Sequence, residues 1–141
     1  MTTQITLDDY WMGRDKDYAS SLTDAIRFNA ENTVSLVNRL LFSATNAGVL
    51  LVAGKSNSLV NSGWRPPAVN QATPNAAKRS RHMTGQACDI HDPDGTLDKW
   101  CAANLPALAK VGLWMEHPKA TPGWCHLQTI PPKSGNRIFI P

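Results

Sequence analysis

The chain has 141 residues, 42% of them hydrophobic, which predicts one globular domain over residues 1–141 and excludes a disordered chain. A formal net charge of +3 is too small to indicate a nucleic-acid-binding protein, although it suits an anionic target. No apolar run approaches the roughly 20 residues of a membrane span, and the N-terminus lacks the basic and apolar regions of a secretory signal. We therefore expect a protein that is made and folded in the cytoplasm, with no stable membrane association.

The first half of the chain predicts a long helix, a hairpin and a short helix. Ser21–Asp24 has the spacing of a capping box, and apolar residues then recur every three to four positions, so the long helix should run to about Ser43. Residues 48–53 and 58–64 have the pattern of two strands, with turn-forming residues between them, which predicts the hairpin. Residues 68–73 predict the short helix.

The second half predicts three more strands and one more helix. Residues 86–90 are short and mostly apolar, as in a buried strand. Residues 97–110 predict a helix that Pro106 divides. Residues 113–116 and 124–129 predict a second pair of strands. The expected fold is therefore α+β, a small single domain in which helices pack on an antiparallel sheet.

His82, Asp89 and His126 are candidate ligands of one metal ion at this sheet. Catalytic zinc takes three nitrogen or oxygen ligands and leaves the fourth position to water. Seven residues of straight strand would separate His82 from Asp89 by roughly 23 Å, so the chain must fold back between them, and Gly85 permits a tight bend. Asp89 would be an acid among apolar neighbours, which needs a cation as partner. The alternative is that Asp89 caps a turn and both histidines lie on the surface.

The three cysteines, Cys88, Cys101 and Cys125, are an odd number and form no CxxC motif, which argues against a disulfide framework. Cys88 and Cys125 stand beside candidate ligands, but on an extended chain they point to the opposite face. We expect both to be small core residues. Zinc ligation by cysteine is the alternative.

The motif Ser-x-His-x-x-Gly-x-Ala-x-Asp-Ile at residues 80–90 is preceded by Ser62–Asn70 and followed by Trp124-x-His126. Together these segments resemble the M15 zinc peptidases, which are D-alanyl-D-alanine carboxypeptidases and peptidoglycan endopeptidases, including bacteriophage endolysins. The resemblance covers nearly the whole chain. It implies that the cofactor is Zn²⁺ and that the His–Asp–His set binds it.

Two residues are candidates for substrate binding. Arg65 stands directly before Pro66-Pro67, which hold the backbone rigid, and a guanidinium can bind a carboxylate through two parallel hydrogen bonds. The resemblance implies that Arg65 contacts the substrate carboxylate, whereas the alternative is an ion pair with one of the eleven acids of the chain. The resemblance also implies a substrate contact by Ser80, whose hydroxyl could equally hold the loop in shape.

Glu116 is the candidate general base. If it pairs near Trp124 in an antiparallel ladder, it lies diagonally from His126 on the metal side of the sheet, where it could take a proton from zinc-activated water. Several M15 peptidases carry an acid three residues before the last ligand, but here that position is Gly123. His117 is the alternative base, and Glu116 could also be an ordinary exposed acid.

The expected function is zinc-dependent hydrolysis of peptidoglycan peptides. We expect a monomeric phage endolysin endopeptidase that cuts the stem peptide or the cross-link after the membrane has been opened. One alternative is a D,D-carboxypeptidase or dipeptidase that acts on terminal D-Ala-D-Ala. Another is a catalytically inactive wall-binding or virion structural module. The sequence leaves the scissile bond open.

Overall fold

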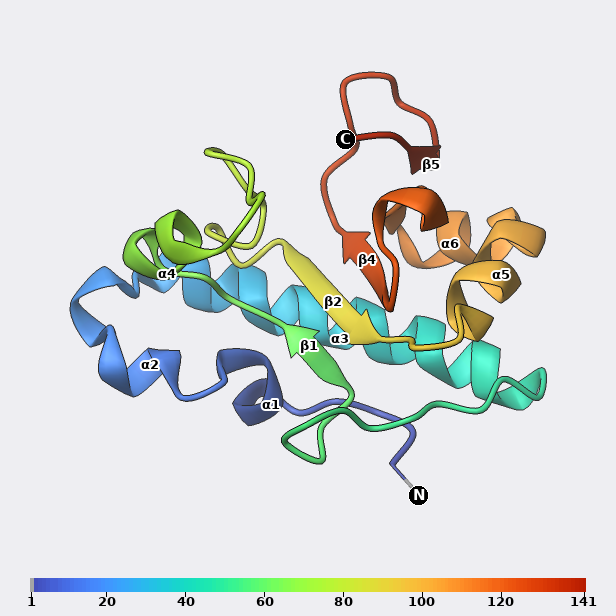
Figure 1. Cartoon of the computed structure of the whole chain (residues 1–141), viewed down its shortest axis with the longest axis horizontal. Coiled ribbons are helices and arrows are strands. Elements are labelled where there is room, and N and C mark those ends of the chain that lie inside the picture. Colours follow the sequence, from blue (N-terminus) through green and yellow to red (C-terminus); the bar gives the residue numbers. More distant parts are fainter. Residues whose placement is uncertain (1) are drawn as a thin grey trace.

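The computed structural model describes residues 2–141 and has an α+β architecture, as predicted (Figure 1). The five strands are β1 (Val60–Ser62), β2 (Ala87–His91), β3 (Trp114–Glu116), β4 (Trp124–Gln128) and β5 (Ile138–Phe139), and they form one sheet in the order β1-β2-β4-β3-β5. The α-helices are α1 (Leu7–Trp11), α2 (Arg14–Asp17), α3 (Asp24–Asn46), α4 (Pro67–Ala72), α5 (Thr96–Ala103) and α6 (Leu105–Val111). Two 3₁₀ turns, Ala19–Ser21 and Pro118–Ala120, complete the regular structure.

The sheet is mixed, so the prediction of a wholly antiparallel sheet is wrong at one strand pair. The pairs β1–β2, β2–β4 and β3–β4 are antiparallel, whereas β5 pairs with β3 in parallel. Both edges of β4 are already occupied by β2 and β3. The chain reverses direction after β4 and pairs with the free edge of β3, so β5 runs in the same direction as β3.

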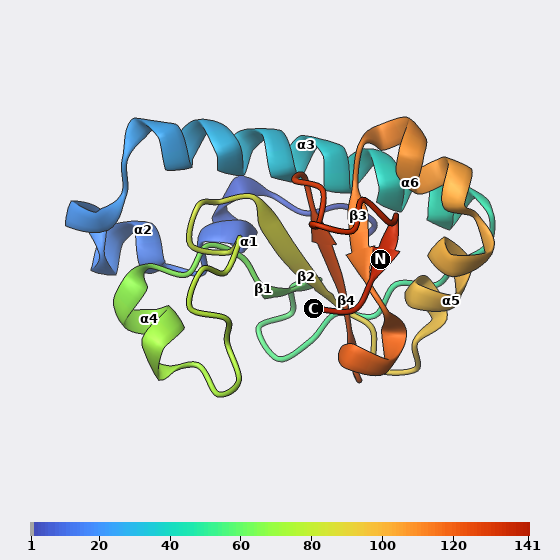
Figure 2. The same ribbon diagram turned by 90° about the horizontal axis from the view of Figure 1, so that it is seen from above.

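The long helix α3 lies along one face of the sheet (Figures 1 and 2). Its N-cap is Thr23, whose hydroxyl accepts a hydrogen bond from the backbone amide of Ile26, so the helix begins slightly later than the sequence predicts. Its buried side chains, including Val37 and Leu40, share one apolar core with Cys88 and other inward-facing residues of the strands. This packing fixes α3 against β2, and the opposite face of β2 remains available for polar side chains.

The first strand of the predicted hairpin is not formed. Residues 49–53 are extended, and their exposure alternates, with Leu51 buried and Leu50 and Val52 exposed, but they have no partner strand. The predicted division of the second helix is confirmed, because α5 ends at Ala103 and α6 begins with proline in its first turn. Within residues 2–141, none of the helices has the length and apolar character that crossing a membrane requires.

Candidate metal centre

The β2–β4 ladder places Asp89 directly opposite His126, and the turn before β2 brings His82 to the same point. Asp89 Oδ1 lies 2.9 Å from His126 Nδ1 and 3.2 Å from His82 Nε2. One donor atom from each of the three side chains lies within 4.8 Å of the other two, and all three residues are buried. The predicted convergence of His82, Asp89 and His126 is therefore present, and the group could hold a metal ion.

The turn between His82 and Asp89 is held against α3. Gly85 has a φ of +76°, and a Cβ atom at this position would lie 2.8 Å from the carbonyl oxygen of Ile26 in that helix. The hydroxyl of Thr33 donates a 2.7 Å hydrogen bond to the carbonyl of Gly85. Glycine is thus required here both for its backbone angle and for the close approach, as the predicted fold-back demands. The long helix thereby fixes where His82 stands.

His82 is oriented with one ring nitrogen facing the site. Its Nδ1 donates a 2.8 Å hydrogen bond to the carbonyl of Gly63, since a carbonyl can only accept, and this directs Nε2 toward Asp89. Nε2 is buried and has no hydrogen-bond partner, although Asp89 Oδ1 is only 3.2 Å away. A buried nitrogen without a partner is costly, whereas coordination of a metal ion would satisfy it.

A second chain of hydrogen bonds orients His126. The side-chain amide of Gln128 donates a 2.7 Å hydrogen bond to the carbonyl of Ile130, so its Oε1 faces the imidazole and accepts from His126 Nε2 at 2.9 Å. With the ring hydrogen on Nε2, the nitrogen that faces Asp89 is Nδ1, which is free to coordinate a metal. In each histidine, one ring nitrogen therefore donates a hydrogen bond to a fixed acceptor. The other ring nitrogen faces Asp89, where it could coordinate a metal ion.

The cluster favours a positive charge at its centre. Burial raises the pKa of Asp89, but the neighbouring His82 and the hydrogen bond from His126 outweigh this effect and hold the pKa below its usual range. Burial alone would lower the pKa of His126, yet the hydrogen bond to Asp89 and the charge of that carboxylate raise it to about 9. A divalent cation bound to Nδ1 would take over the role that the proton has on His126.

The donor set contains no thiolate. Cys88 and Cys125 are free and fully buried in the core, on the opposite face of their strands from Asp89 and His126, so their predicted role as core residues is confirmed. Two imidazole nitrogens and one carboxylate oxygen are a ligand set that leaves an open coordination position, as in catalytic centres.

The cluster forms part of the wall of a cleft of about 660 Å³. Arg65, Ser80 and Glu116 line the same cleft, so each predicted substrate or catalytic residue stands near the candidate ligands. His117 lies outside it and lines a separate hollow with Lys119, and its Nδ1 accepts a hydrogen bond from the Lys119 amide. This position disfavours His117 as the base.

Glu116 lies closer to His126 than the sequence predicts. The β3–β4 register pairs Trp114 with Gln128, so by continuation Glu116 is opposite His126 itself and not near Trp124. Because the register differs by two residues, the side chain stays on the expected face. Glu116 Oε1 lies 3.7 Å from His126 Nε2, and burial raises the pKa of Glu116 against the opposing charge of His126. A carboxylate with a raised pKa is suited to accept a proton near neutral pH.

Arg65 enters the cleft without an acidic partner. The residue is only 9% exposed and its Nε is buried with no hydrogen bond. No ion pair within residues 2–141 includes Arg65, so the alternative of a structural ion pair is not observed there. Ser80 Oγ accepts a 3.2 Å hydrogen bond from the His82 amide, so it holds the loop and also faces the cleft.

Three groups of the site were not predicted from the sequence: the carbonyl of Gly63, the side chain of Gln128 and the guanidinium of Arg14. Gln128 has a signal in the sequence, because it lies two residues after His126 in the same strand and so shares its face. Gly63 lies in the Ser62–Asn70 segment that resembles the M15 peptidases, but the contacts that Gly63 and Arg14 make at the site come from tertiary packing.

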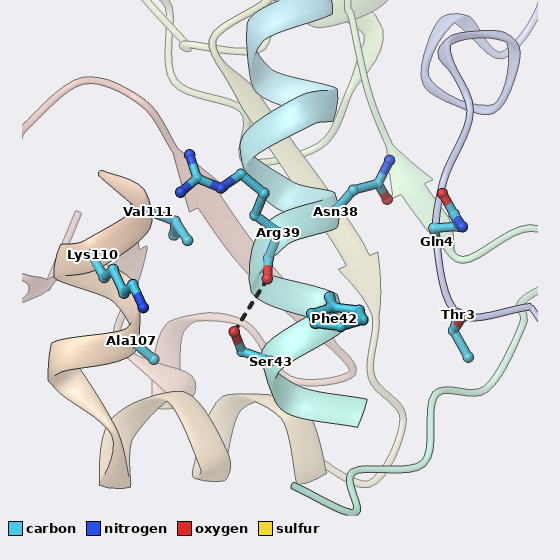
Figure 3. A pocket seen from close by; sticks show the side chains of 9 residues that line it. All are labelled: Thr3, Gln4, Asn38, Arg39, Phe42, Ser43, Ala107, Lys110 and Val111. Atoms are coloured by element: carbon cyan, nitrogen blue, oxygen red, sulfur yellow. Dashed lines mark hydrogen bonds between the residues drawn. The ribbon is translucent and has the colours of Figure 1, made fainter. Parts of the chain in front are cut away.

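A second hollow of about 610 Å³ lies between α3, α6 and the N-terminal segment (Figure 3). Arg39, Phe42 and Lys110 are among its lining residues, and the lining includes no His, Cys, Asp or Glu. It therefore offers none of the usual metal ligands.

Comparison with protein-family models, with curated proteins and with solved structures gave no match for this chain.

Proposed function

We propose that the protein is a zinc-dependent hydrolase of peptidoglycan peptides. The observation that carries the proposal is the buried His82–Asp89–His126 group, which opens into a cleft that also contains an acid and an unpaired arginine. Two nitrogens and one carboxylate oxygen suit zinc, and a centre that performs hydrolysis needs the open position that three ligands leave. The resemblance of residues 80–90 and their flanking segments to M15 peptidases supports peptidoglycan as the substrate.

When bound, zinc lowers the pKa of water toward about 7 and polarises a peptide carbonyl. Glu116 acts as the general base that accepts a proton from the attacking water and then returns it to the leaving amine. Arg65 binds a carboxylate of the substrate and positions the peptide. The hydrogen bonds from Gly63 and Gln128 keep both imidazoles in the orientation that binding of the ion requires.

The first reaction to test is endopeptidase cleavage of the stem peptide or cross-link, by an endolysin that reaches the wall once the membrane is open. A D,D-carboxypeptidase is the second candidate, because the unpaired guanidinium of Arg65 would suit a terminal carboxylate. Mass spectrometry of products from purified peptidoglycan separates the two. Cleavage of interior bonds supports the endopeptidase, and loss of terminal D-Ala alone supports the carboxypeptidase. If the zinc-loaded protein releases no product, the hydrolase is refuted and a non-catalytic wall-binding module remains.

Glu116→Gln tests the assigned base. We expect this variant to keep its zinc and to lose about 10²- to 10⁴-fold in rate, as is usual when a general base is removed. Glu31→Gln is the matched control, since Glu31 is exposed on α3, and it should keep full activity. Near-normal turnover by Glu116→Gln would show that another group accepts the proton.

A further inference from the structure

Arg14 and Arg65 reach the cleft from segments that are far apart in the sequence. Arg14 is the first residue of α2, which lies at the same end of the molecule as α4 (Figures 1 and 2). Its guanidinium nitrogen Nη1 donates a 2.9 Å hydrogen bond to the carbonyl of Trp64, the residue before Arg65. Both arginines line the cleft that contains His82, Asp89 and His126. Two guanidinium groups thus line the same cleft as the candidate metal ligands.

The two arginines lack ion-pair partners among residues 2–141. Arg65 Nε is also buried without a hydrogen-bond partner. Burial lowers the pKa of Arg14, and the positive charge of Arg65 lowers it further, whereas Tyr18 acts in the opposite direction. Asp89 and Glu116 oppose the effect of burial on Arg65, but neither acts on Arg14. An anionic ligand would offset the positive charge that acts on Arg14.

The Trp64 carbonyl occupies only part of the Arg14 fork. A guanidinium has five N–H donors in a plane, and Arg14 uses one nitrogen for the carbonyl, so an edge remains that can bind a carboxylate through two hydrogen bonds. The rigid anchor also limits the loss of side-chain entropy on binding. Because both arginines line the cleft of the candidate metal ligands, a substrate with two acidic groups could pair with both of them.

We propose that Arg14 is a specificity-determining residue that binds a second free carboxylate of the substrate, while Arg65 binds the first. The proposal rests on the proposed peptidase function and narrows its substrate to acidic peptides with two carboxylates on one side of the scissile bond. A stem peptide of the form L-Ala-γ-D-Glu-meso-diaminopimelate fits this description when the D-Glu carboxylate is free. Conversion of that carboxylate to a carboxamide removes the charge and leaves the size almost unchanged.

The test compares kcat/KM for this peptide and for its D-Glu carboxamide, using the zinc-loaded protein. Wild type should prefer the free acid by about tenfold to a hundredfold, which is the range expected for one charged hydrogen-bonded contact. Arg14→Gln should lose this preference by slowing cleavage of the acid while leaving cleavage of the amide within about twofold. Lys16→Gln, an exposed residue of the same helix outside the cleft, should behave as wild type.

Equal cleavage of acid and amide by wild type would overturn the proposal, and so would an equal loss on both peptides in Arg14→Gln. Arg14→Lys keeps the charge but not the fork, so a partial preference is expected from it even if Arg14→Gln fails to fold. If wild type cleaves neither peptide, the proposed peptidase function fails, and calorimetric binding of the same two peptides then decides the inference. Tighter binding of the acid that Arg14→Lys weakens supports the subsite, and equal binding of both peptides refutes it.

Discussion

Replacement of Gln128 by leucine tests whether the hydrogen bond behind His126 matters for metal binding. The side chain has nearly the same volume, but it cannot accept the 2.9 Å hydrogen bond from His126 Nε2. Without that acceptor the imidazole loses its preference for the tautomer in which Nδ1 is free, and its ring is no longer fixed. Outer hydrogen-bond partners of metal ligands are worth about 10- to 100-fold in affinity, which corresponds to about 1.4–2.7 kcal/mol.

The assay is zinc affinity measured by competition with a chromophoric chelator at fixed pH. Gln71→Leu is the matched control, because Gln71 is exposed on α4 and does not line the cleft. We expect Gln128→Leu to bind zinc about 10- to 100-fold more weakly than wild type, and Gln71→Leu to bind it normally. Equal affinity of Gln128→Leu and wild type would refute the reasoning about the tautomer, as would an equal loss in both variants.

Two further predictions concern the fold. Burial, and then the charge of Asp92, raise the pKa of Asp98 from 3.8 to about 6. The folded state therefore binds the Asp98 proton more tightly than the unfolded state does. The stability that this gives is complete below pH 3.8 and is lost as the pH rises through about 6. In chelator, Asp98→Asn should match wild type near pH 4 and be about 1–2 kcal/mol more stable by urea unfolding at pH 7.5. A pH-independent difference would contradict this. Gly63→Ala places a Cβ atom 1.9 Å from the carbonyl oxygen of Tyr10, and should lower the free energy of unfolding by about 1–3 kcal/mol and also weaken zinc binding. An unchanged free energy of unfolding would contradict this, because it would mean that α1 and the residue after β1 can separate without cost.

The placement of two candidate ligands, His82 and Asp89, is predictable from the sequence because these residues are close together in the chain. A fold-back at Gly85 and the two-residue period of β2 together decide which way His82 and Asp89 face. His126 is added by one antiparallel pairing, and a register shift of two residues, as found for Glu116, leaves each side chain on the same face. The predicted face of each side chain is therefore correct even where the predicted strand register is wrong by two residues.

Features that depend on distant partners are not predictable in this way. The alternation in residues 49–53 correctly indicates extended chain, but a strand needs a neighbour, and none lies beside this segment. The parallel position of β5 depends on which sheet edge it joins, which the sequence pattern does not contain. Arg14 is tied to the cleft by a hydrogen bond to Trp64, 50 residues later in the chain, so local spacing does not indicate its position.

The most direct test of the metal centre is elemental analysis of the purified protein after zinc loading and removal of excess ion, with His82→Ala analysed beside it. We predict about one zinc ion per chain in wild type and almost none in His82→Ala, whose helical circular dichroism should be retained because the buried side chains of α3 pack in the apolar core. Wild type without bound metal, or His82→Ala with a full complement, would contradict the account.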